Sequence, residues 1–344
     1  MSTLVLGAGG FLGLNIVDAL VAAGSTPRCG RRVRSNVIPL RSRKLPMVVA
    51  DLEQPETLRE AMRDTKTVVH AAGYYPRLSL DYEGAIRIGR TQLENVLDAA
   101  AASGVERVVY VSSTATIAPR ADGSASTEAD GFASVPGFGL YHDLKWTMES
   151  IALAEQRLEV VIACPGACIG PWDLRVGTSA LVVGIARGVN PPHPDGIVNI
   201  VDARDVGQLV AKMALSTTSV PKRVLMAAHN RQVHPMLESL AKRYGVAPPS
   251  APLRADEAKA LAFSEESRAA ECGGRPAVSR EIVDLIVHGA PVDASLATQA
   301  LGARFRSWTE TLDAFDDWAR RMRLIPEQPG YWSTEHGSES ITQP

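Results

Sequence analysis

The sequence predicts an α/β protein: a doubly wound parallel sheet followed by a smaller, mainly helical C-terminal lobe. Through the first half, short runs rich in Val and Ile alternate with longer segments whose apolar residues have helical spacing. The short runs are apolar throughout, which is typical of parallel strands covered by helices on both faces. Beyond about residue 170 the pattern loosens, Pro and Gly cluster in GVNPPHPDG, and helical segments dominate to about residue 323.

The elements of the first half follow in strict alternation. A strand over 3–6 enters a glycine-rich turn at 7–13, and a helix follows that ends at Gly24, a natural C-terminal cap. Further strands are predicted near 47–50 and over 67–73, 107–113 and 160–166, and further helices over 55–63, 84–103 and the segment around Tyr141. We expect one domain over 1–166, with 197–215 returning to it, a second lobe over 167–327, and a disordered tail over 328–344.

Composition excludes several classes of function. The 344 residues are 45% hydrophobic and 22% charged, with a net charge of −2 and no basic block rich in aromatics. We therefore expect no nucleic-acid partner. No apolar run approaches the ~20 residues that span a bilayer. The N-terminus lacks the basic region of a signal peptide, so we expect no membrane association and a cytoplasmic location.

The cysteines and histidines form no metal-binding pattern. Cys164 and Cys168 make a Cys-x3-Cys pair without a nearby histidine or further cysteine, and the seven histidines are scattered along the chain. We expect reduced, buried thiols and no metal.

The turn after the first strand has the spacing G-x-x-G-x-x-G, at Gly7, Gly10 and Gly13. Glycine permits the positive φ angles of a tight turn and lets a pyrophosphate approach the backbone. The N–H groups that open the following helix, at Phe11 and Leu12, would bind the phosphates with the help of the helix dipole. Because the turn joins a strand to a helix at the start of a βαβ unit, it predicts a dinucleotide site.

The residues after the second strand favour NADP over NAD. An acidic residue there would hydrogen-bond the adenine ribose of NAD, whereas an arginine would bind the 2′-phosphate of NADP. The chain has Arg28, Arg31 and Arg32 at this place and no carboxylate before Asp51. Arg32 is best placed, with Arg31 beside it, although a solvated basic patch remains an alternative.

Tyr141 and Lys145 stand four residues apart, on one face of a predicted helix. Reduction of a carbonyl needs a proton donor for the oxygen while hydride adds to the carbon. Tyrosine, with a pKa of about 10, serves only if its phenolate is stabilised. Lys145 would supply that stabilisation and hold the nicotinamide ribose. A hydroxyl at the end of the strand VVYVSSTAT, from Thr114 or Ser113, would bind the carbonyl oxygen.

Taken together, these motifs resemble the extended short-chain dehydrogenase/reductases. The resemblance covers about residues 1–215 and rests on GAGGFLG, the Asp51–Leu52 pair, HAAG at 70–73, VYVSSTAT, YHDLK, the Pro165–Gly166 turn and IVDARDVGQLV. Within that family the sequence is most similar to the dihydroflavonol-reductase-like and 3β-hydroxysteroid-dehydrogenase-like branch. The resemblance implies a Rossmann domain with a C-terminal substrate lobe, and hydride transfer assisted by a Ser/Thr, Tyr and Lys set.

The resemblance also implies residue roles: Tyr141 as acid/base, Lys145 as the partner that lowers its pKa, and Thr114 as the catalytic hydroxyl, with Ser113 as the alternative. Further cofactor-lining residues would be Asp51, Leu52, Ala71, Ala72, Gly73, Ser112, Pro165 and Gly166. A helix-capping role stays open for Asp51, and simple turn hydrogen bonding for Ser112 and Ser113. Gly89 stands where the family often has asparagine, which puts a water-based proton relay or a helix-bending contact in doubt.

Aromatic residues favour a hydrophobic or aromatic carbonyl substrate, with Tyr74, Phe138 and Trp172 as candidate contacts. The leading hypothesis is an NADP-dependent ketone or aldehyde reductase, or the reverse alcohol dehydrogenase. The alternatives are a 3β-hydroxysteroid-type dehydrogenase, an NAD(P)-dependent sugar epimerase or dehydratase, and a non-catalytic NADP-sensing protein. A homodimer through the helices near 84–103 and 141–157 is also expected, although packing within one chain would equally explain their apolar faces.

Overall fold

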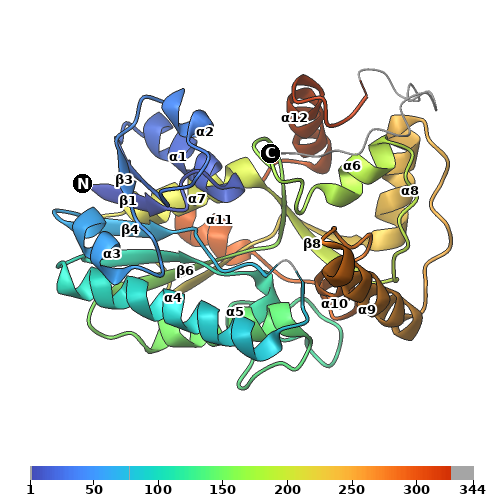
Figure 1. Cartoon of the computed structure of the whole chain (residues 1–344), viewed down its shortest axis with the longest axis horizontal. Coiled ribbons are helices and arrows are strands. Elements are labelled where there is room, and N and C mark those ends of the chain that lie inside the picture. Colours follow the sequence, from blue (N-terminus) through green and yellow to red (C-terminus); the bar gives the residue numbers. More distant parts are fainter. Residues whose placement is uncertain (1, 77, 327–344) are drawn as a thin grey trace.

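A computed structural model describes residues 2–76 and 78–326, and Figure 1 shows their arrangement. The predicted tail at 328–344 and the last residue of the predicted lobe lie outside the described residues. The main sheet has seven parallel strands in the order β3-β2-β1-β4-β5-β6-β9. They are β1 (Thr3–Leu6), β2 (Arg28–Arg31), β3 (Met47–Val49), β4 (Thr67–His70), β5 (Arg107–Val111), β6 (Glu159–Pro165) and β9 (Arg223–Met226).

Helices cover both faces of this sheet (Figure 1). Those of the first half are α1 (Phe11–Ala22), α2 (Ile38–Arg41), α3 (Pro55–Met62), α4 (Tyr82–Ala102), the 3-10 turn η1 (Thr114–Thr116) and α5 (Leu140–Ala154). The chain winds outward from β1 to β3, then returns to β4 and winds the other way. The order therefore reverses between β1 and β4, the place where doubly wound sheets bind their ligands. The predicted fold class is confirmed.

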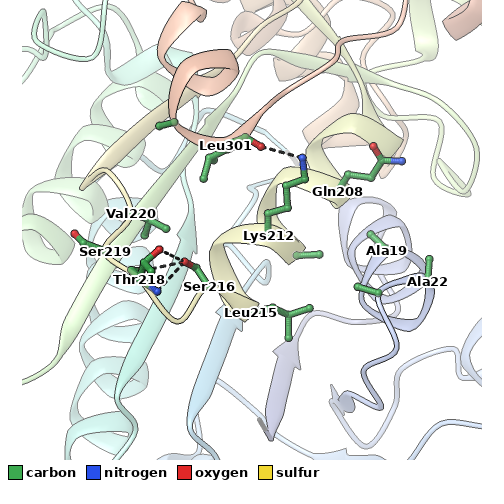
Figure 2. A pocket seen from close by; sticks show the side chains of 13 residues that line it. Ala19, Ala22, Gln208, Lys212, Leu215, Ser216, Thr218, Ser219, Val220 and Leu301 are labelled. Carbon is green, nitrogen blue, oxygen red and sulfur yellow. Dashed lines mark hydrogen bonds between the residues drawn. The ribbon is translucent and has the colours of Figure 1, made fainter.

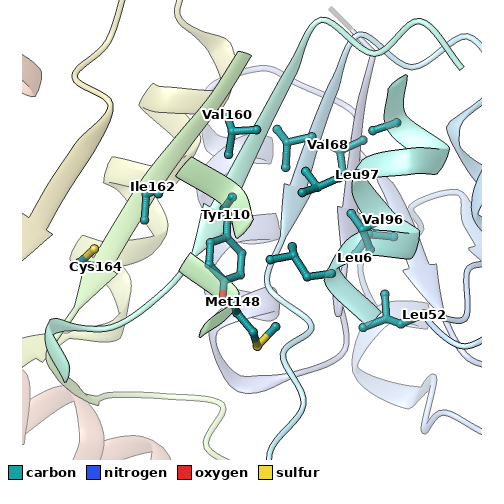
Figure 3. Close-up of a cluster of buried hydrophobic side chains, with 14 of the residues drawn as sticks. Leu6, Leu52, Val68, Val96, Leu97, Tyr110, Met148, Val160, Ile162 and Cys164 are labelled. Carbon is teal, nitrogen blue, oxygen red and sulfur yellow. The ribbon is translucent and has the colours of Figure 1, made fainter. Parts of the chain in front are cut away.

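The strands alternate their buried side chains between two cores, one on each face of the sheet. In β1, Leu4 and Leu6 join the core under α3, α4 and α5, whereas Val5 joins the core under α1 and α7 (Ala203–Leu215). Figure 3 shows the first of these cores, in which Tyr110 of β5 and Met148 of α5 lie among aliphatic side chains. Burial on both faces explains why the strands are apolar throughout.

The second lobe is built around a three-stranded sheet in the order β10-β8-β7. Its elements are β7 (Ala167–Ile169), α6 (Ala180–Ala186), β8 (Ile197–Asp202), β10 (His229–Gln232), α8 (Val233–Tyr244), α9 (Ala255–Cys272), α10 (Arg280–Val287) and α12 (Trp308–Arg321), whereas α11 (Ser295–Leu301) packs on α7 and β9 of the main sheet. The chain passes between the lobes more than once, because α7 packs on α1 and β9 then pairs with β6. A Cβ on Gly207 of α7 would lie 2.5 Å from the carbonyl oxygen of Asn15, so glycine brings these two helices into backbone contact.

Among the described residues, no helix has both the length and the hydropathy that crossing a membrane requires.

Gly89 sets the distance between α4 and α5. A Cβ at this position would lie 2.4 Å from Cδ1 of Leu144 and 3.3 Å from the sulfur of Met148, and both of those side chains are fully buried. The space that an asparagine side chain would need is therefore filled by α5. The departure from the family pattern, noted from the sequence, has a packing reason.

We expect Gly89→Ala to destabilise the protein by about 1–3 kcal/mol, because the added methyl group overpacks a closed core. Urea unfolding measures the difference. Gly184→Ala in α6 is the matched control, since the nearest atom to its added Cβ is 3.9 Å away. Removing a helical glycine without a clash should be neutral or should stabilise by up to about 1 kcal/mol. Equal effects at both positions would contradict the packing argument.

Candidate active site

The glycine turn is built by close backbone contacts. Gly7 has a φ of +77°, and a Cβ there would lie 2.8 Å from the carbonyl oxygen of Ala71, at the end of β4. A Cβ on Gly13 would lie only 2.0 Å from the carbonyl oxygen of Gly7. Both positions therefore require glycine, and the turn lies directly against the strand on the other side of the topological switch.

The turn and the start of α1 fit a dinucleotide. Gly10 is the N-cap residue and supplies no side-chain hydrogen bond to the helix. The first N–H groups of an α-helix have no acceptor within the helix, and here they belong to Phe11, Leu12 and Gly13. Uncapped N–H groups at a positive helix end are suited to bind phosphate oxygens.

The two arginines at the end of β2, Arg31 within the strand and Arg32 just after it, differ in their contacts. The Arg31 guanidinium donates to the carbonyl oxygens of Arg32 and Val33, at 3.2 and 3.3 Å. Arg32 has an exposed side chain, and its backbone N–H donates to the hydroxyl of Ser35, at 3.0 Å. Arg31 thus shapes the loop, while the side chain of Arg32 extends from it.

Asp51 and Leu52 follow β3. A carboxylate oxygen of Asp51 accepts the N–H of Glu53 at 3.2 Å, and the N–H of Asp51 donates to the Thr57 hydroxyl at 2.9 Å. Asp51 therefore stabilises the turn before α3 but does not cap that helix, whose N-cap residue is Gln54 with no side-chain hydrogen bond. Leu52 is buried in the core, and its carbonyl oxygen accepts from the amide of Asn95 at 2.8 Å. A contact of either residue with adenine stays a prediction.

Tyr141, Lys145, Ser113 and Gly73 come together at the carboxyl ends of β4 and β5. The Nζ atom of Lys145 lies 5.8 Å from the centroid of the Tyr141 ring, and this lysine is only 6% exposed. A Cβ on Gly73 would lie 3.4 Å from the same Nζ atom. The Ser113 hydroxyl hydrogen-bonds Tyr141 and also accepts the N–H of Ala115, at 3.1 Å. The strand-end hydroxyl that reaches the tyrosine is therefore that of Ser113.

Burial dominates the electrostatics of this cluster. It raises the pKa of Tyr141, the nearby Glu281 carboxylate raises it further, and the hydrogen bond from Ser113 lowers it. The expectation from the sequence was a lowered pKa of Tyr141; in the protein by itself the phenol instead keeps its proton. Burial lowers the pKa of Lys145, whereas Glu281 and Glu149 raise it. The cluster thus holds a protonated phenol beside a buried lysine whose pKa is lowered by burial and raised in part by two nearby carboxyl groups.

Ser112 donates a hydrogen bond to a buried carboxylate behind the site, that of Glu149. Its hydroxyl donates to an oxygen of Glu149, which also accepts from the hydroxyl of Thr116 at 2.8 Å and the thiol of Cys164 at 3.6 Å. The other oxygen of Glu149 lies 2.5 Å from the guanidinium of Arg223. This long-range bond to a carboxylate differs from the turn hydrogen bonding that was the alternative for Ser112. A contact of Ser112 with the cofactor stays a prediction.

Thr114 lies on the other side of the strand end and lines a cavity of about 40 Å³. Phe138, His142 and His288 line the same cavity, and the Phe138 ring stacks on His288 with 4.1 Å between the ring centroids. Phe138 is thus adjacent to the predicted catalytic hydroxyl. Burial and the neighbouring His288 lower the pKa of His142 to about 4, so this imidazole is neutral.

The other predicted contacts lie apart from this cavity. Tyr74 packs against the core beneath α4 and α5. Trp172 packs on the opposite core, with the Arg43 guanidinium 4.5 Å from its ring centroid. A Cβ on Gly166 would lie 2.5 Å from the carbonyl oxygen of Asn199 in β8, so this glycine lets the two sheets meet just after Pro165. Ala71 and Ala72 are half-buried beside Gly73.

A groove of about 570 Å³ lies elsewhere, between the ends of α1 and α7 and the helix α11 (Figure 2). Its lining includes Ala22, Leu215 and Leu301, and Lys212 donates to the carbonyl oxygen of Leu301 at 2.9 Å. The C-terminal ends of α1 and α7 stand at the amino ends of the strands, opposite Tyr141. The residues that line this groove include none of the predicted catalytic residues.

Two residues of the site were not among the candidates predicted from the sequence. Tyr75 lies beside Tyr141, with 5.5 Å between the ring centroids, and its hydroxyl donates to the carboxylate of Glu281. Tyr75 could have been noticed in the segment YYPRLSLDY. Glu281 lies 140 residues beyond Tyr141 in a helix of the second lobe, where no motif marks it.

The described residues contain no group of three or more His, Cys, Asp or Glu side chains that could hold a metal ion.

Comparison with known proteins establishes the family. The model of the NAD dependent epimerase/dehydratase family matches residues 3–182. The chain belongs to this family. It is 30% identical, over 94% of its length and 96% of the other, to a Synechocystis sp. protein provisionally named as a dihydroflavonol 4-reductase. It is 27% identical to the dihydroflavonol 4-reductase of Zea mays, over 71% of this chain and 74% of that protein. The resemblance to extended short-chain dehydrogenase/reductases is confirmed.

Solved structures share the fold. That of gox2253 has a TM-score of 0.80 and 25% identity, covering 94% of this chain and 99% of that one. The yeast methylglyoxal/isovaleraldehyde reductase Gre2, solved with NADPH, has a TM-score of 0.70 and 19% identity, covering 94% of this chain and all of that one. A Thermus thermophilus UDP-glucose 4-epimerase, solved with NAD, also scores 0.70, at 20% identity over 93% and 99% of the two chains. Family membership places this chain among NAD(P)-dependent reductases and epimerases, and the glycine turn fits their nicotinamide dinucleotide.

Arg223→Met should destabilise the protein by about 3–5 kcal/mol, because it leaves the carboxylate of Glu149 buried without its charged partner. Urea unfolding measures this, and the double variant with Glu149→Gln should recover part of the loss. Arg90→Met is the control, since Arg90 and Glu94 form an exposed pair 3.7 Å apart that contributes about 0–1 kcal/mol. An equal loss in both single variants would mean that the buried pair contributes no more than the exposed one.

Proposed function

We propose that the protein is an NADP-dependent oxidoreductase that interconverts a carbonyl and a secondary alcohol on a hydrophobic or aromatic small molecule. The observation that carries the proposal is the meeting of Tyr141, Lys145 and Ser113 beside Gly73, at the switch point of the sheet. Two relatives named as dihydroflavonol 4-reductases support a reductase over an epimerase.

When bound, the dinucleotide supplies the hydride. Tyr141, protonated in the buried site, donates its hydroxyl proton to the carbonyl oxygen as negative charge develops there. Ser113 stands within hydrogen-bonding distance of the same phenol and holds the oxygen in place, with Thr114 beside it. Lys145 stabilises the phenolate that remains, because its ammonium group is held in a site of low dielectric.

The aromatic surroundings of the hydroxyls favour an apolar substrate. Phe138 and Phe132 meet edge to face, with 5.5 Å between the ring centroids, and both line the cavity beside Thr114. Neutral His142 adds no charge to this surface. A hydrophobic or aromatic group next to the reacting carbonyl would pack against the rim of this small cavity rather than inside it.

A homodimer through α4 and α5 remains part of the proposal. The outward face of α4 carries charged residues, with Arg90 beside Glu94 and with Asp98 2.8 Å from Arg157. Such a face would pair by polar contacts, and sedimentation of the purified protein tests it.

The first experiment is a fluorescence titration of the purified protein with NADPH and NADH. It is repeated with ketones and aromatic aldehydes while the nicotinamide absorbance is followed. Tighter binding of NADPH together with its oxidation by a panel member is the expected result. Binding without turnover would favour the epimerase or sensor alternatives, and nucleotide sugars would be tested next.

Tyr141→Phe should lower kcat about 10²–10⁴-fold, the usual contribution of a general acid, and leave NADPH affinity nearly unchanged. Steady-state kinetics and a binding titration separate the two effects. Tyr82→Phe is the matched control, because the Tyr82 hydroxyl donates to Asp143 of α5, at 2.9 Å, and not to a member of the catalytic pair. A Tyr141→Phe enzyme with near-normal turnover would exclude the phenol as the acid.

Arg32→Ala should weaken NADPH about 10–100-fold and leave NADH nearly unaffected, because a charge-assisted hydrogen bond to the 2′-phosphate contributes about 1.5–3 kcal/mol. Arg34→Ala changes a second exposed arginine of the same loop and should alter neither affinity. Equal losses for both dinucleotides in Arg32→Ala would show that this side chain does not bind the 2′-phosphate.

A further inference from the structure

The second lobe places a carboxylate in the active site. Glu281 is the second residue of α10 and is half-buried, and it accepts a hydrogen bond from the hydroxyl of Tyr75. The Tyr75 ring lies against that of Tyr141, while 59% of Tyr75 remains exposed to solvent. Tyr75, which is in contact with water, thus connects the ring of Tyr141 to the carboxylate of Glu281.

The docking of α10 explains why Glu281 faces α5. A Cβ on Gly139, the residue that caps the start of α5, would lie 2.2 Å from a carboxylate oxygen of Asp284. Glu281 and Asp284 are three residues apart and share one face of α10. That face therefore meets the first turn of α5, where Tyr141 lies.

A second carboxylate holds this arrangement in place. Glu266 of α9 is 1% exposed and accepts the N–H groups of Ser79 and Arg280, at 2.8 and 2.9 Å. It thereby joins the segment that follows β4, which carries Tyr75, to the start of α10, which carries Glu281. Glu266 thus fixes the segments that carry Tyr75 and Glu281 relative to each other.

The titratable groups that face Glu281 come from three other elements. They are Tyr75 after β4, Tyr141 and Lys145 on α5, and Glu266 on α9. The pKa of Glu281 is raised to about 7: burial raises it most and Glu266 raises it too, while Tyr75 and Lys145 lower it. On its own helix, Asp284 is 3.8 Å from Lys259. Near neutral pH, Glu281 is therefore able both to donate and to accept a proton.

The two helices beside the catalytic pair differ in what they offer it. Each reduction removes one proton from the Tyr141–Lys145 pair, and Lys145 is buried. On the side of α4, Gly89 has no side chain, and Leu144 and Met148 fill the space next to it. On the side of α10, Glu281 and the partly exposed Tyr75 place titratable groups near the pair.

We propose that Glu281 donates a proton to the Tyr141–Lys145 pair after each reduction. Glu281 is then reprotonated from the solvent beside Tyr75. This rests on the proposed function. The phenol O–H of Tyr141 breaks as the alcohol O–H forms, an N–H proton of Lys145 passes to the phenolate, and the carboxyl proton of Glu281 restores Lys145. One proton enters from water for each one that leaves in the alcohol, and the hydride of NADPH brings the electron pair.

The test compares Glu281→Gln with Asp284→Asn, the same change in charge one turn along the same helix. With NADPH and the best substrate of the ketone and aldehyde panel, wild-type kcat should fall as pH rises through about 7, because Glu281 loses the proton that it must donate. Glu281→Gln should lower kcat about 10-fold or more, remove that limb of the profile, and respond to added imidazole or formate with a rising rate. Asp284→Asn should keep the wild-type profile.

Tyr75→Phe provides a second variant at an exposed position, where folding is not at risk. It should lower kcat by a smaller factor and leave KM unchanged. A normal pH profile in Glu281→Gln, or a lowered kcat without rescue by either buffer acid, would overturn the relay and leave a charge or packing role.

A readout without substrate separates this inference from the proposed function. Infrared difference titration of the wild-type protein should show a protonated-carboxyl band that disappears near neutral pH. The band should be absent in Glu281→Gln and present in Asp284→Asn. If no panel member is reduced, the proposed function fails, while this band still reports the protonation state of Glu281. If the band is unchanged in Glu281→Gln, the inference about Glu281 fails whatever the substrate.

Discussion

The catalytic surface depends on one buried ion pair, that of Glu149 with Arg223. The carboxylate is 1% exposed and joins five elements: Ser112 just after β5, Thr116 of η1, Cys164 at the end of β6, Arg223 at the start of β9, and its own helix α5. A buried carboxylate is tolerated only when each of its oxygens has a partner. Those partners come from the strand ends that also carry Ser113, Thr114 and Pro165. Glu149 is one turn beyond Lys145, so the same interaction sets the position of the helix that presents Tyr141.

Contacts at three glycines set the spacing of the layers around this pair. Gly13 lies against Gly7 within the phosphate turn, Gly207 brings α7 onto α1, and Gly89 brings α5 onto α4. In each case a Cβ would lie less than 3 Å from a neighbouring atom. The floor of the dinucleotide site and the helix with the catalytic pair are therefore held at distances that larger residues would not allow.

The second lobe contributes residues to the surroundings of Tyr141. Helix α10 contacts the first turn of α5 through Asp284, and Glu266 of α9 binds the backbone of both α10 and the segment after β4. The environment of Tyr141 is thus completed by residues separated from it by more than a hundred positions. This explains why the electrostatics of the tyrosine are governed by Glu281 as well as by burial.

The sequence by itself determined what depends on local pattern. Continuous apolar runs identified most strands of the main sheet, the glycine spacing identified the turn at its switch point, and a four-residue interval identified the Tyr141–Lys145 pair. The strands β7, β8, β9 and β10 were not recognised, because short or polar segments such as HNRQ acquire their pairing only from neighbours distant in sequence. Tertiary structure alone decided that Ser113 lies beside the phenol of Tyr141 and that Ser112 donates a hydrogen bond to Glu149. It also decided that Trp172 packs against the guanidinium of Arg43 and that Glu281 lies beside Tyr141. Each of these is a contact between segments far apart in the chain, where no periodicity or spacing carries information.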